Sequence, residues 1–405
     1  MIFESAGAAL VAGFTSLALT KLVISVARRF QLFEKTDNRR THSGDIPFLG
    51  GIGIAVGFMV AASCAYLLFL RLHPARAFST RYLAAVLLGI SMIHVTGVVD
   101  DFRNIPAMRK LALQLMAAAI AISGGVLIEQ VNIVGGSVVI VLGPLSVPFT
   151  LLWIVAVSNA VNLIDGMDGL AGGVSLIAVT TLGFWAYLTG DTLLLMLCAS
   201  LVGALVGFLY FNLPPARVFM GDGGSLFLGF CLAVLPLVSG RGTPAPFPLP
   251  ALALLLLVPA ADTIAAIVRR AKRNVPFHTP DREHVHHKLQ DLGLSARQAL
   301  LVIYAFCIMG ALSASAWLFM SGIPGMILRP AAGIIGAGAL WWLYNHSVPE
   351  GAQHAAPART SSIAATLFYD LFPRPTTAQW RFETPVTMSR RAKPRTRREP
   401  VAGMS

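Results

Sequence analysis

The feature that most constrains this chain is a series of apolar runs, each close to 20 residues long. A helix that crosses the roughly 30 Å hydrocarbon core of a bilayer needs about 20 such residues. Only 12% of the 405 residues are charged, which is about half the fraction typical of a soluble protein. A cytosolic enzyme and a disordered protein are therefore excluded. The sequence predicts an all-α polytopic membrane protein.

Eleven runs are expected to form transmembrane helices. They cover residues 4–27, 48–70, 82–99, 107–127, 147–164, 168–189, 192–211, 224–240, 249–268, 297–320 and 326–344. The short, Gly-rich and β-branched segment 128–146 predicts a small hairpin or a re-entrant piece at the membrane surface. Pro259 within a later run permits a helix kink at that position. We therefore expect one transmembrane domain over residues 1–345.

Lysine and arginine residues indicate how the domain is oriented. Within residues 1–345, most of them follow the runs 4–27, 82–99 and 249–268, and loops rich in these residues stay in the cytoplasm. The smaller group Arg71, Arg76 and Arg81 lies on the opposite side. The N-terminus is therefore expected outside, and an odd number of helices places the C-terminus in the cytoplasm.

The end of the chain differs in composition from the rest. Residues 346–405 combine Pro, Ala, Ser and Thr with the basic segment R390-R-A-K-P-R-T-R-R398. Such a composition is typical of a disordered cytoplasmic tail. In a membrane protein, the net charge of +12 indicates contact with anionic lipid head groups, and nucleic acid is not an expected partner.

Carboxylates and amides collect at the expected cytoplasmic ends of the helices. Asp100 and Asp101 end one apolar run, and Asn159, Asn162, Asp165 and Asp168 follow at intervals of three residues in a later region. If this region is helical, the spacing lines the four side chains along one stripe. Oxygen ligands of this kind suit Mg²⁺. The alternative is a polar seam between helices.

Two further motifs have the chemistry of phosphate binding. F219-M-G-D-G-G-S225 precedes an apolar run, and backbone N–H groups at a helix N-terminus attract phosphate. Alternatively, Asp222 is an N-cap. In P276-F-H-T-P-D-R-E-H-V-H-H-K-L289, Thr279 and Pro280 predict a helix start and Gly293 predicts its end. The histidines and Arg282 favour phosphate over zinc, because no cysteine accompanies them.

These four stretches, in this order, resemble the polyprenyl-phosphate N-acetylhexosamine-1-phosphate transferases of the glycosyltransferase family 4 type. The segments D37-N-R-R-T-H42 and P47-F-L-G-G51 resemble the first cytoplasmic loop of that family. The pattern D-R-x-H-x-H-H at 281–287 resembles the UDP-GlcNAc:undecaprenyl-phosphate GlcNAc-1-phosphate transferase branch. Arg282 and Val285 depart from the form typical of the peptidoglycan branch.

The resemblance implies a multi-pass enzyme of the bacterial inner membrane. It would transfer N-acetylhexosamine 1-phosphate, by default GlcNAc 1-phosphate, from a UDP-sugar to undecaprenyl phosphate and release UMP. This would be the first membrane step of O-antigen, cell-wall or other surface polysaccharide synthesis. The alternatives are the same reaction with UDP-N-acetylfucosamine or UDP-N-acetylquinovosamine, or a secondary transporter. The oligomeric state stays open, with a homodimer among the alternatives.

The resemblance also implies roles for individual residues. The expected catalytic residues are Asp100, Asp101, Asp165, Asp168 and His284. Asp222 and Asn162 are the expected ligands of Mg²⁺, for which Mn²⁺ is a substitute. The expected contacts to the UDP-sugar are Asn212, Phe219, Arg282, His284, His286 and His287, and those to the lipid phosphate are Lys110, Arg40 and His42.

Overall fold

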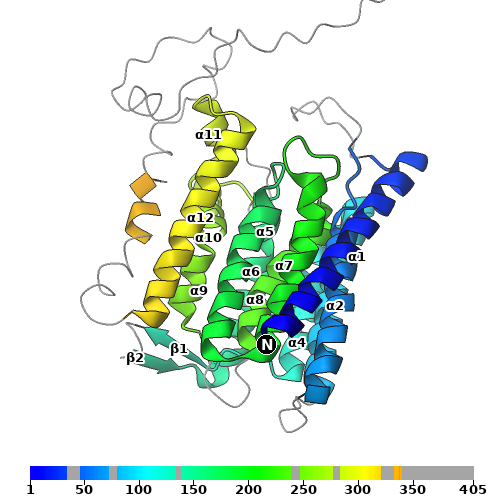
Figure 1. Cartoon of the computed structure of the whole chain (residues 1–405). Helices are drawn as coiled ribbons and strands as arrows, with labels where there is room; N and C mark the ends of the chain where they lie inside the picture. Colours follow the sequence, from blue (N-terminus) through cyan, green and yellow to red (C-terminus); the bar gives the residue numbers. More distant parts are fainter. Residues whose placement is uncertain are drawn as a thin grey trace, which may run out of the picture. The chain divides into compact units, whose positions relative to one another are not determined.

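The structure, a computed structural model, is a bundle of long helices (Figure 1). It describes residues 1–33, 46–72, 80–133, 138–238, 247–276, 283–320, 333–336 and 338–339. The chain divides into two units, Met1–Val348 and Pro349–Ser405. The second unit lies outside the described residues, so the expected basic tail stays a prediction.

The apolar runs form helices, as predicted. The long ones are α1 (Ile2–Arg29), α2 (Gly51–Leu72), α3 (Thr80–Arg103), α4 (Ala107–Gly124), α5 (Ser146–Ile164), α6 (Leu170–Thr189), α7 (Thr192–Asn212), α8 (Gly221–Val238) and α12 (Ala296–Phe319). These nine helices of the described chain are long and apolar enough to span a membrane. The chain is therefore a polytopic membrane protein. The eleventh expected helix, 326–344, lies largely outside the described residues.

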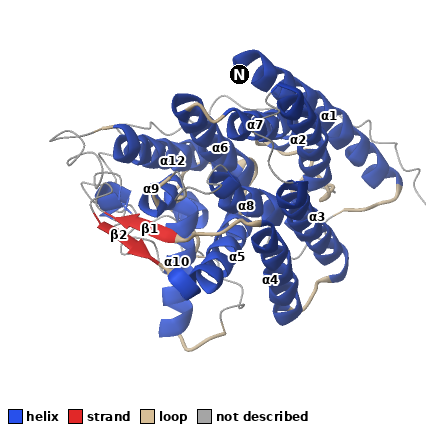
Figure 2. Ribbon diagram, turned by 90° about the horizontal axis from the view of Figure 1, so that it is seen from below, coloured by secondary structure: helices blue, strands red, loops and turns tan. Residues whose placement is uncertain are grey.

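The segment between α4 and α5 confirms the expected hairpin. Strands β1 (Gln130–Ile133) and β2 (Val138–Val141) pair in an antiparallel register, with Gln130 opposite Val141. Figure 1 shows this hairpin at the lower end of the bundle, and the short helix α11 (Val285–Asp291) at the upper end. Figure 2 shows the two strands in red, beside α9 and α10.

The ninth apolar run is broken into two helices. Helices α9 (Leu249–Leu255) and α10 (Leu257–Lys272) meet at an angle of 85°. The expected kink in this run is therefore confirmed, and it lies at Leu256, three residues before Pro259. Pro259 is the third residue of α10, where a backbone N–H has no partner within the helix. Proline loses no helical hydrogen bond at such a position.

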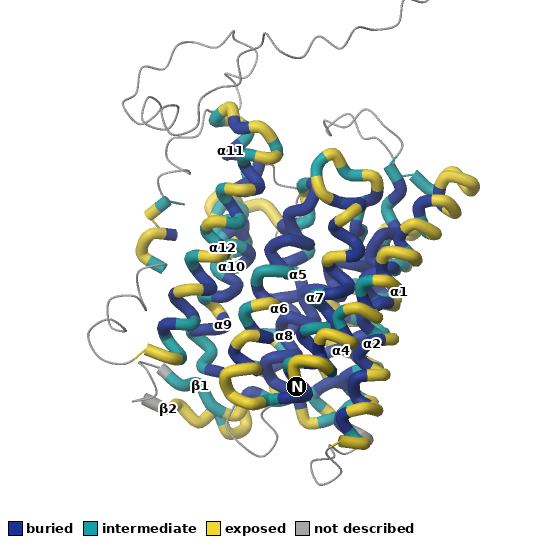
Figure 3. The backbone as a smooth tube through the Cα atoms, in the orientation of Figure 1, coloured by how far each residue is buried: buried dark blue, intermediate teal, exposed yellow. Residues whose placement is uncertain are grey.

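Helix α8 lies at the centre of the bundle, and its neighbours cover it (Figure 3). In its most apolar stretch 89% of the residues are buried, compared with 22% in α1. Close backbone contact makes this packing possible. A methyl group on Gly97 of α3 would lie only 2.3 Å from the carbonyl oxygen of Asp222 in α8. The glycine therefore sets how closely α3 approaches the start of α8.

We expect Gly97→Ala to lower the melting temperature of the purified protein, because the added methyl group forces α3 away from α8. Overpacking of this kind costs about 1–3 kcal/mol. Gly7→Ala is the matched control, since no atom of the described chain lies within 4 Å of a methyl group at that position. Thermal unfolding in detergent measures both variants. Equal melting temperatures would contradict the proposed tight contact.

Candidate active site

Charged groups from three helices meet at the end of the bundle. The Nζ atom of Lys110 in α4 lies 2.7 Å from Oδ2 of Asp100 in α3, and it also contacts Oδ2 of Asp222 in α8. The side chains of Lys110 and Asp100 are largely buried, with 16% and 9% exposed. Such buried charges need a partner, because their removal from water is costly. Lys110 therefore balances two carboxylates.

Asp101 holds the start of α8. Its Oδ1 accepts a hydrogen bond of 2.7 Å from the backbone N–H of Asp222, and its Oδ2 accepts one of 3.1 Å from that of Gly223. We expected either a phosphate or the Asp222 side chain at these N–H groups. That expectation is wrong, because a carboxylate from α3 occupies them. Asp101 therefore fixes the position of Asp222.

Two asparagine side chains of α5 contact α8 and α4, the helices that contribute Asp222 and Lys110 to this cluster. Asn162 donates hydrogen bonds to Oδ1 of Asp222 at 2.8 Å and to the Ser225 hydroxyl at 2.9 Å. One turn earlier, Asn159 exchanges hydrogen bonds with Gln114 of α4. The expected stripe of four side chains is only half correct, because α5 ends at Ile164. Asp165 and Asp168 lie beyond the helix.

The loop after α5 is fixed to the loop before α8. Oδ2 of the buried Asp168 accepts a hydrogen bond of 2.9 Å from the backbone N–H of Ala216. Asn212 accepts from the N–H of Gly169 and donates to the carbonyl of Val218. Both side chains therefore support loops. The catalytic role of Asp168 and the uridine contact of Asn212 stay predictions, as does the role of the half-buried Asp165.

The two glycines at the start of α2, Gly50 and Gly51, also have a structural role. The backbone N–H groups of Gly50 and Gly51 donate to the carbonyls of Phe219 and Met220, each at 2.9 Å. The N–H of Phe219 donates in return to Pro47 at 2.7 Å. This pairing joins the first-loop motif to the motif that starts α8. The ring of Phe219 is half-buried, while Arg40, His42 and Arg282 lie outside the described residues.

The histidines form a stack at the start of α11. The rings of His284 and His286 are parallel with centroids 6.0 Å apart, and those of His286 and His287 are 4.1 Å apart. A methyl group on Gly166 would lie 2.9 Å from Nε2 of His286. The histidine motif therefore contacts the loop that follows α5. All four motifs are joined at this end of the bundle.

The helix that contains His286 and His287 starts later in the chain than predicted. Glu283 and His284 are not helical, and α11 begins at Val285. The predicted start at Pro280 is therefore wrong, whereas Gly293 does follow the helix, with a φ of +91°. Burial, together with the neighbouring His287 and His284, lowers the pKa of His286 to about 3. His286 is therefore neutral at pH 7, and its expected contact with the UDP-sugar stays a prediction.

Sequence reasoning missed Asp262. This residue lies in α10 and is only 1% exposed. Its Oδ2 lies 2.7 Å from Nδ1 of His284, and its Oδ1 accepts a hydrogen bond of 3.0 Å from the N–H of Val285. The signal was present in the sequence, because Asp262 is the one acidic residue of the run 249–268. An ionisable residue in a membrane span is a functional candidate.

Three basic side chains surround Glu283, the residue that precedes His284. Glu283 contacts Arg273, and its carboxylate lies 3.5 Å from Nζ of Lys288 and 3.9 Å from Nε of Arg269. Burial alone would raise the pKa of Glu283. The hydrogen bond from Arg273 and the three positive charges outweigh burial and lower that pKa. The ionised Glu283 therefore ties α10 to α11 through several ion pairs.

Comparisons with known proteins identify the family of this chain. The family model for glycosyl transferase family 4 matches residues 83–240. A probable undecaprenyl-phosphate N-acetylglucosaminyl 1-phosphate transferase of Bacillus subtilis (strain 168) is 35% identical over 307 residues, covering 75% of this chain and 82% of that protein. The chain belongs to glycosyl transferase family 4.

Other members of the family are similar over comparable lengths. The decaprenyl-phosphate N-acetylglucosaminephosphotransferase of Mycolicibacterium smegmatis is 33% identical and covers 81% of this chain and 86% of its own length. The undecaprenyl-phosphate alpha-N-acetylglucosaminyl 1-phosphate transferase of Escherichia coli (strain K12) is 30% identical, with 72% and 77% covered. These similarities confirm the resemblance found in the sequence motifs.

The donor set of this family member suits a hard cation. Among the described residues, no group of three or more His, Cys, Asp or Glu side chains is arranged to hold a metal ion. Asp100 and Asp222 nevertheless share one cationic group, Lys110. Mg²⁺ is usually bound by one or two carboxylates together with substrate phosphates. Asp222 therefore fits Mg²⁺ when a phosphorylated ligand completes its coordination, and Asn162, the other expected ligand, lies beside it.

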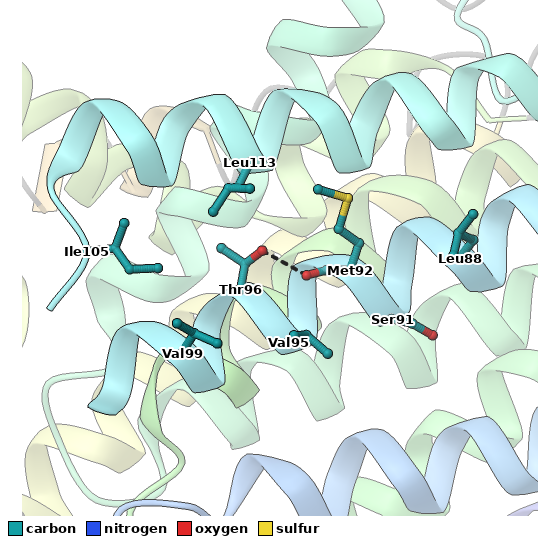
Figure 4. Close-up of a pocket in the computed structure, with 8 residues that line it drawn as sticks. All are labelled: Leu88, Ser91, Met92, Val95, Thr96, Val99, Ile105 and Leu113. Atoms are coloured by element: carbon teal, nitrogen blue, oxygen red, sulfur yellow. Dashed lines mark hydrogen bonds between the residues drawn. The ribbon is translucent and has the colours of Figure 1, made fainter. Parts of the chain in front are cut away.

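An apolar groove begins next to these charges (Figure 4). It has a volume of about 420 Å³ and lies between α3 and α4, where it is lined by Leu88, Ser91, Met92, Val95, Thr96, Val99, Ile105 and Leu113. Val99 directly precedes Asp100, and the N–H of Ile105 donates to Oδ1 of Asp100. The groove therefore extends from the charged cluster along the apolar part of α3.

We expect Lys110→Met to lower the melting temperature strongly, because it leaves Asp100 and Asp222 without their shared cation. Breaking a buried ion pair costs about 3–5 kcal/mol. The double variant Lys110→Met/Asp100→Asn should regain part of the loss, since it removes the repulsion between the carboxylates. Lys21→Met, at an exposed position of α1, is the control. A double variant less stable than Lys110→Met would refute this account.

Proposed function

We propose that this chain transfers N-acetylglucosamine 1-phosphate from UDP-N-acetylglucosamine to a polyprenyl phosphate and releases UMP. Its relatives are named for the transfer of this phosphorylated sugar to undecaprenyl or decaprenyl phosphate. The observation that carries the proposal is the junction of Asp100, Lys110, Asn162 and Asp222 at one end of the bundle. Such a site can neutralise phosphates beside the bilayer.

The reaction is a phosphoryl transfer. An oxygen of the lipid phosphate attacks the β-phosphorus of the UDP-sugar, and the bond between this phosphorus and the bridging oxygen breaks as UMP leaves. Such a reaction depends on positioning and on charge neutralisation. The second pKa of a phosphate monoester is about 6, so the acceptor is mostly a dianion at neutral pH. Asp100 therefore acts by orienting Lys110 toward the lipid phosphate.

A divalent ion completes the proposed site. Asp222 would hold Mg²⁺, or Mn²⁺ in its place, together with the amide oxygen of Asn162, whose amide nitrogen contacts Asp222. The bound ion would supply positive charge to the phosphates as they approach one another. Asp101 contributes indirectly, because it holds the first turn of α8 and thereby positions the carboxylate of Asp222.

In this proposal, the end of the bundle that carries Asp100, Lys110 and Asp222 faces the cytoplasm. Arg28 and Arg29 close α1, and Arg269, Arg270 and Lys272 close α10. Basic residues beside membrane spans favour the cytoplasmic side, where a nucleotide sugar is available. The protein would thus lie in the bacterial cytoplasmic membrane with its N-terminus outside. Its lipid-linked product would start O-antigen, cell-wall or another surface polysaccharide.

The alternatives account for fewer of the observations. A secondary transporter places its ionisable residues near the middle of the bilayer on broken helices. Here Asp100, Asp165 and Asp222 lie at helix ends, on one end of the bundle. Transfer from UDP-N-acetylfucosamine or UDP-N-acetylquinovosamine would use the same phosphate contacts, but the names of the relatives favour N-acetylglucosamine.

We expect membranes containing the protein to transfer label from UDP-N-acetylglucosamine to undecaprenyl phosphate, with the product in the organic phase. Added UMP should release the label, and EDTA should stop the reaction. Asp222→Asn should lower kcat about 100-fold or more, because one charge that positions Lys110 and the ion is lost.

The control for this assay is Asp191→Ser. Asp191 caps the start of α7 by accepting a hydrogen bond from the N–H of Leu194, and serine retains this ability. Its activity should therefore match that of the wild type. Labelled sugar trapped inside vesicles, with no lipid product, would contradict the enzymatic function. Activity that survives EDTA would contradict only the proposed role of the divalent ion and would leave the enzymatic function in place.

We also propose that the groove between α3 and α4 takes the isoprenoid chain of the acceptor. The stretch from Leu88 to Val99 spans about 16 Å of helix. Leu88→Trp should therefore raise KM for undecaprenyl phosphate several-fold and leave KM for a two-isoprene phosphate unchanged. Leu67→Trp, at an exposed position of α2, is the control. Unchanged values for both acceptors would exclude this groove.

A further inference from the structure

The contact between α10 and the histidine stack goes beyond what the proposed reaction uses. Asp262 lies six residues after the break at Leu256 and is almost completely buried, as is His284, at 1% and 6% exposed. A carboxylate in such a place is tolerated only when its oxygens have partners. One oxygen contacts the imidazole of His284, and the other accepts the N–H of Val285.

We propose that Asp262 is a positioning residue that sets the tautomer of His284. An ionised carboxylate can only accept hydrogen bonds, so the contact of 2.7 Å requires a proton on Nδ1 of His284. The other ring nitrogen, Nε2, then carries a lone pair and is left to accept a hydrogen bond from a hydroxyl group of the sugar. This inference rests on the proposed function and on the contact between His284 and the UDP-sugar that the sequence motifs predict.

The second contact of Asp262 makes the arrangement rigid. The N–H of Val285 opens α11, and its hydrogen bond to Oδ1 of Asp262 fixes which oxygen faces the imidazole. The ring of His284 also lies parallel to that of His286, which contacts the loop at Gly166. The imidazole is therefore held on two sides. A partner that fixes both tautomer and ring orientation is a recurring device at functional histidines.

The replacement Asp262→Asn discriminates this role from simple packing. The N–H of Val285 can only donate, so the amide oxygen of asparagine must stay at the position of Oδ1. The amide NH₂ then faces Nδ1 of His284 and repels a proton there. Asparagine has nearly the shape of aspartate, but it selects the opposite tautomer, with the proton on Nε2. A residue that acted only by packing would tolerate this change.

We expect Asp262→Asn to lower kcat/KM for the UDP-sugar roughly 10- to 100-fold and to leave KM for undecaprenyl phosphate unchanged. The double variant Asp262→Asn/His284→Gln should be no worse than His284→Gln, because both changes remove the same contact. Losses that multiply in the double variant would overturn the proposal.

The matched control is Thr263→Val. The Thr263 hydroxyl is buried beside Asp262 in the same helix and makes no hydrogen bond with the described part of the chain. Valine has almost the same shape, so this variant should keep the wild-type kcat/KM and melting temperature. If Thr263→Val lost as much kcat/KM as Asp262→Asn, the effect would belong to α10 packing, and the proposal would fail.

The tautomer itself gives a readout that does not depend on activity. In NMR spectra of protein labelled with ¹⁵N-histidine, the signals of His284 are identified as those that are absent from the spectrum of the His284→Gln variant. They should report a proton on Nδ1 in the wild type and on Nε2 in Asp262→Asn. An unchanged tautomer would overturn the proposal. If the wild type failed to transfer the sugar but showed this switch, the proposed function would fail and the role of Asp262 would stand.

Discussion

The need to balance buried charge organises this end of the protein. Lys110 lies between two carboxylates that come from different helices, and each of the three groups is costly to bury alone. None of α3, α4 and α8 can therefore shift without leaving a charge unpaired. The same arrangement suits the proposed reaction, because a site that already concentrates opposite charges can receive phosphates and a divalent ion with little rearrangement.

Close packing supports this electrostatic arrangement. Gly97 lets α3 approach the first turn of α8, so that Asp101, one turn further along, reaches two backbone N–H groups of α8. Gly50 and Gly51 bring the start of α2 against the same turn through backbone hydrogen bonds. The motif glycines thus bring backbone close to backbone, and the position of Asp222 follows from these contacts.

Much of the fold and part of the site could be predicted from the sequence. Apolar runs identify membrane helices because the bilayer demands a fixed length, and the motifs predicted that carboxylates and amides, among them Asp101, Asn162 and Asp222, collect at one end of the helices. Individual partners could not be predicted. Whether Asp101 binds an ion or a helix end depends on the distance between α3 and α8, which the packing of the whole bundle sets.

Two further differences have similar causes. The regular spacing from Asn159 to Asp168 predicted one helical stripe, but the helix ends at Ile164 and Gly169 adopts a positive φ of 76°. Asp262 escaped notice because its partner, His284, lies 22 residues away and beyond the end of α10. Periodicity describes a single helix and carries no information about contacts between a helix and a segment that follows it.

The break between α9 and α10 has a mechanical consequence. Asp262 and the ion pairs of Glu283 couple α10 to α11. A change in the angle between α9 and α10 at Leu256 would therefore move α10 and α11 together. Helices in a bilayer adjust their tilt when its thickness changes. A change in lipid thickness that altered the tilt of α10 would therefore also move the imidazole of His284.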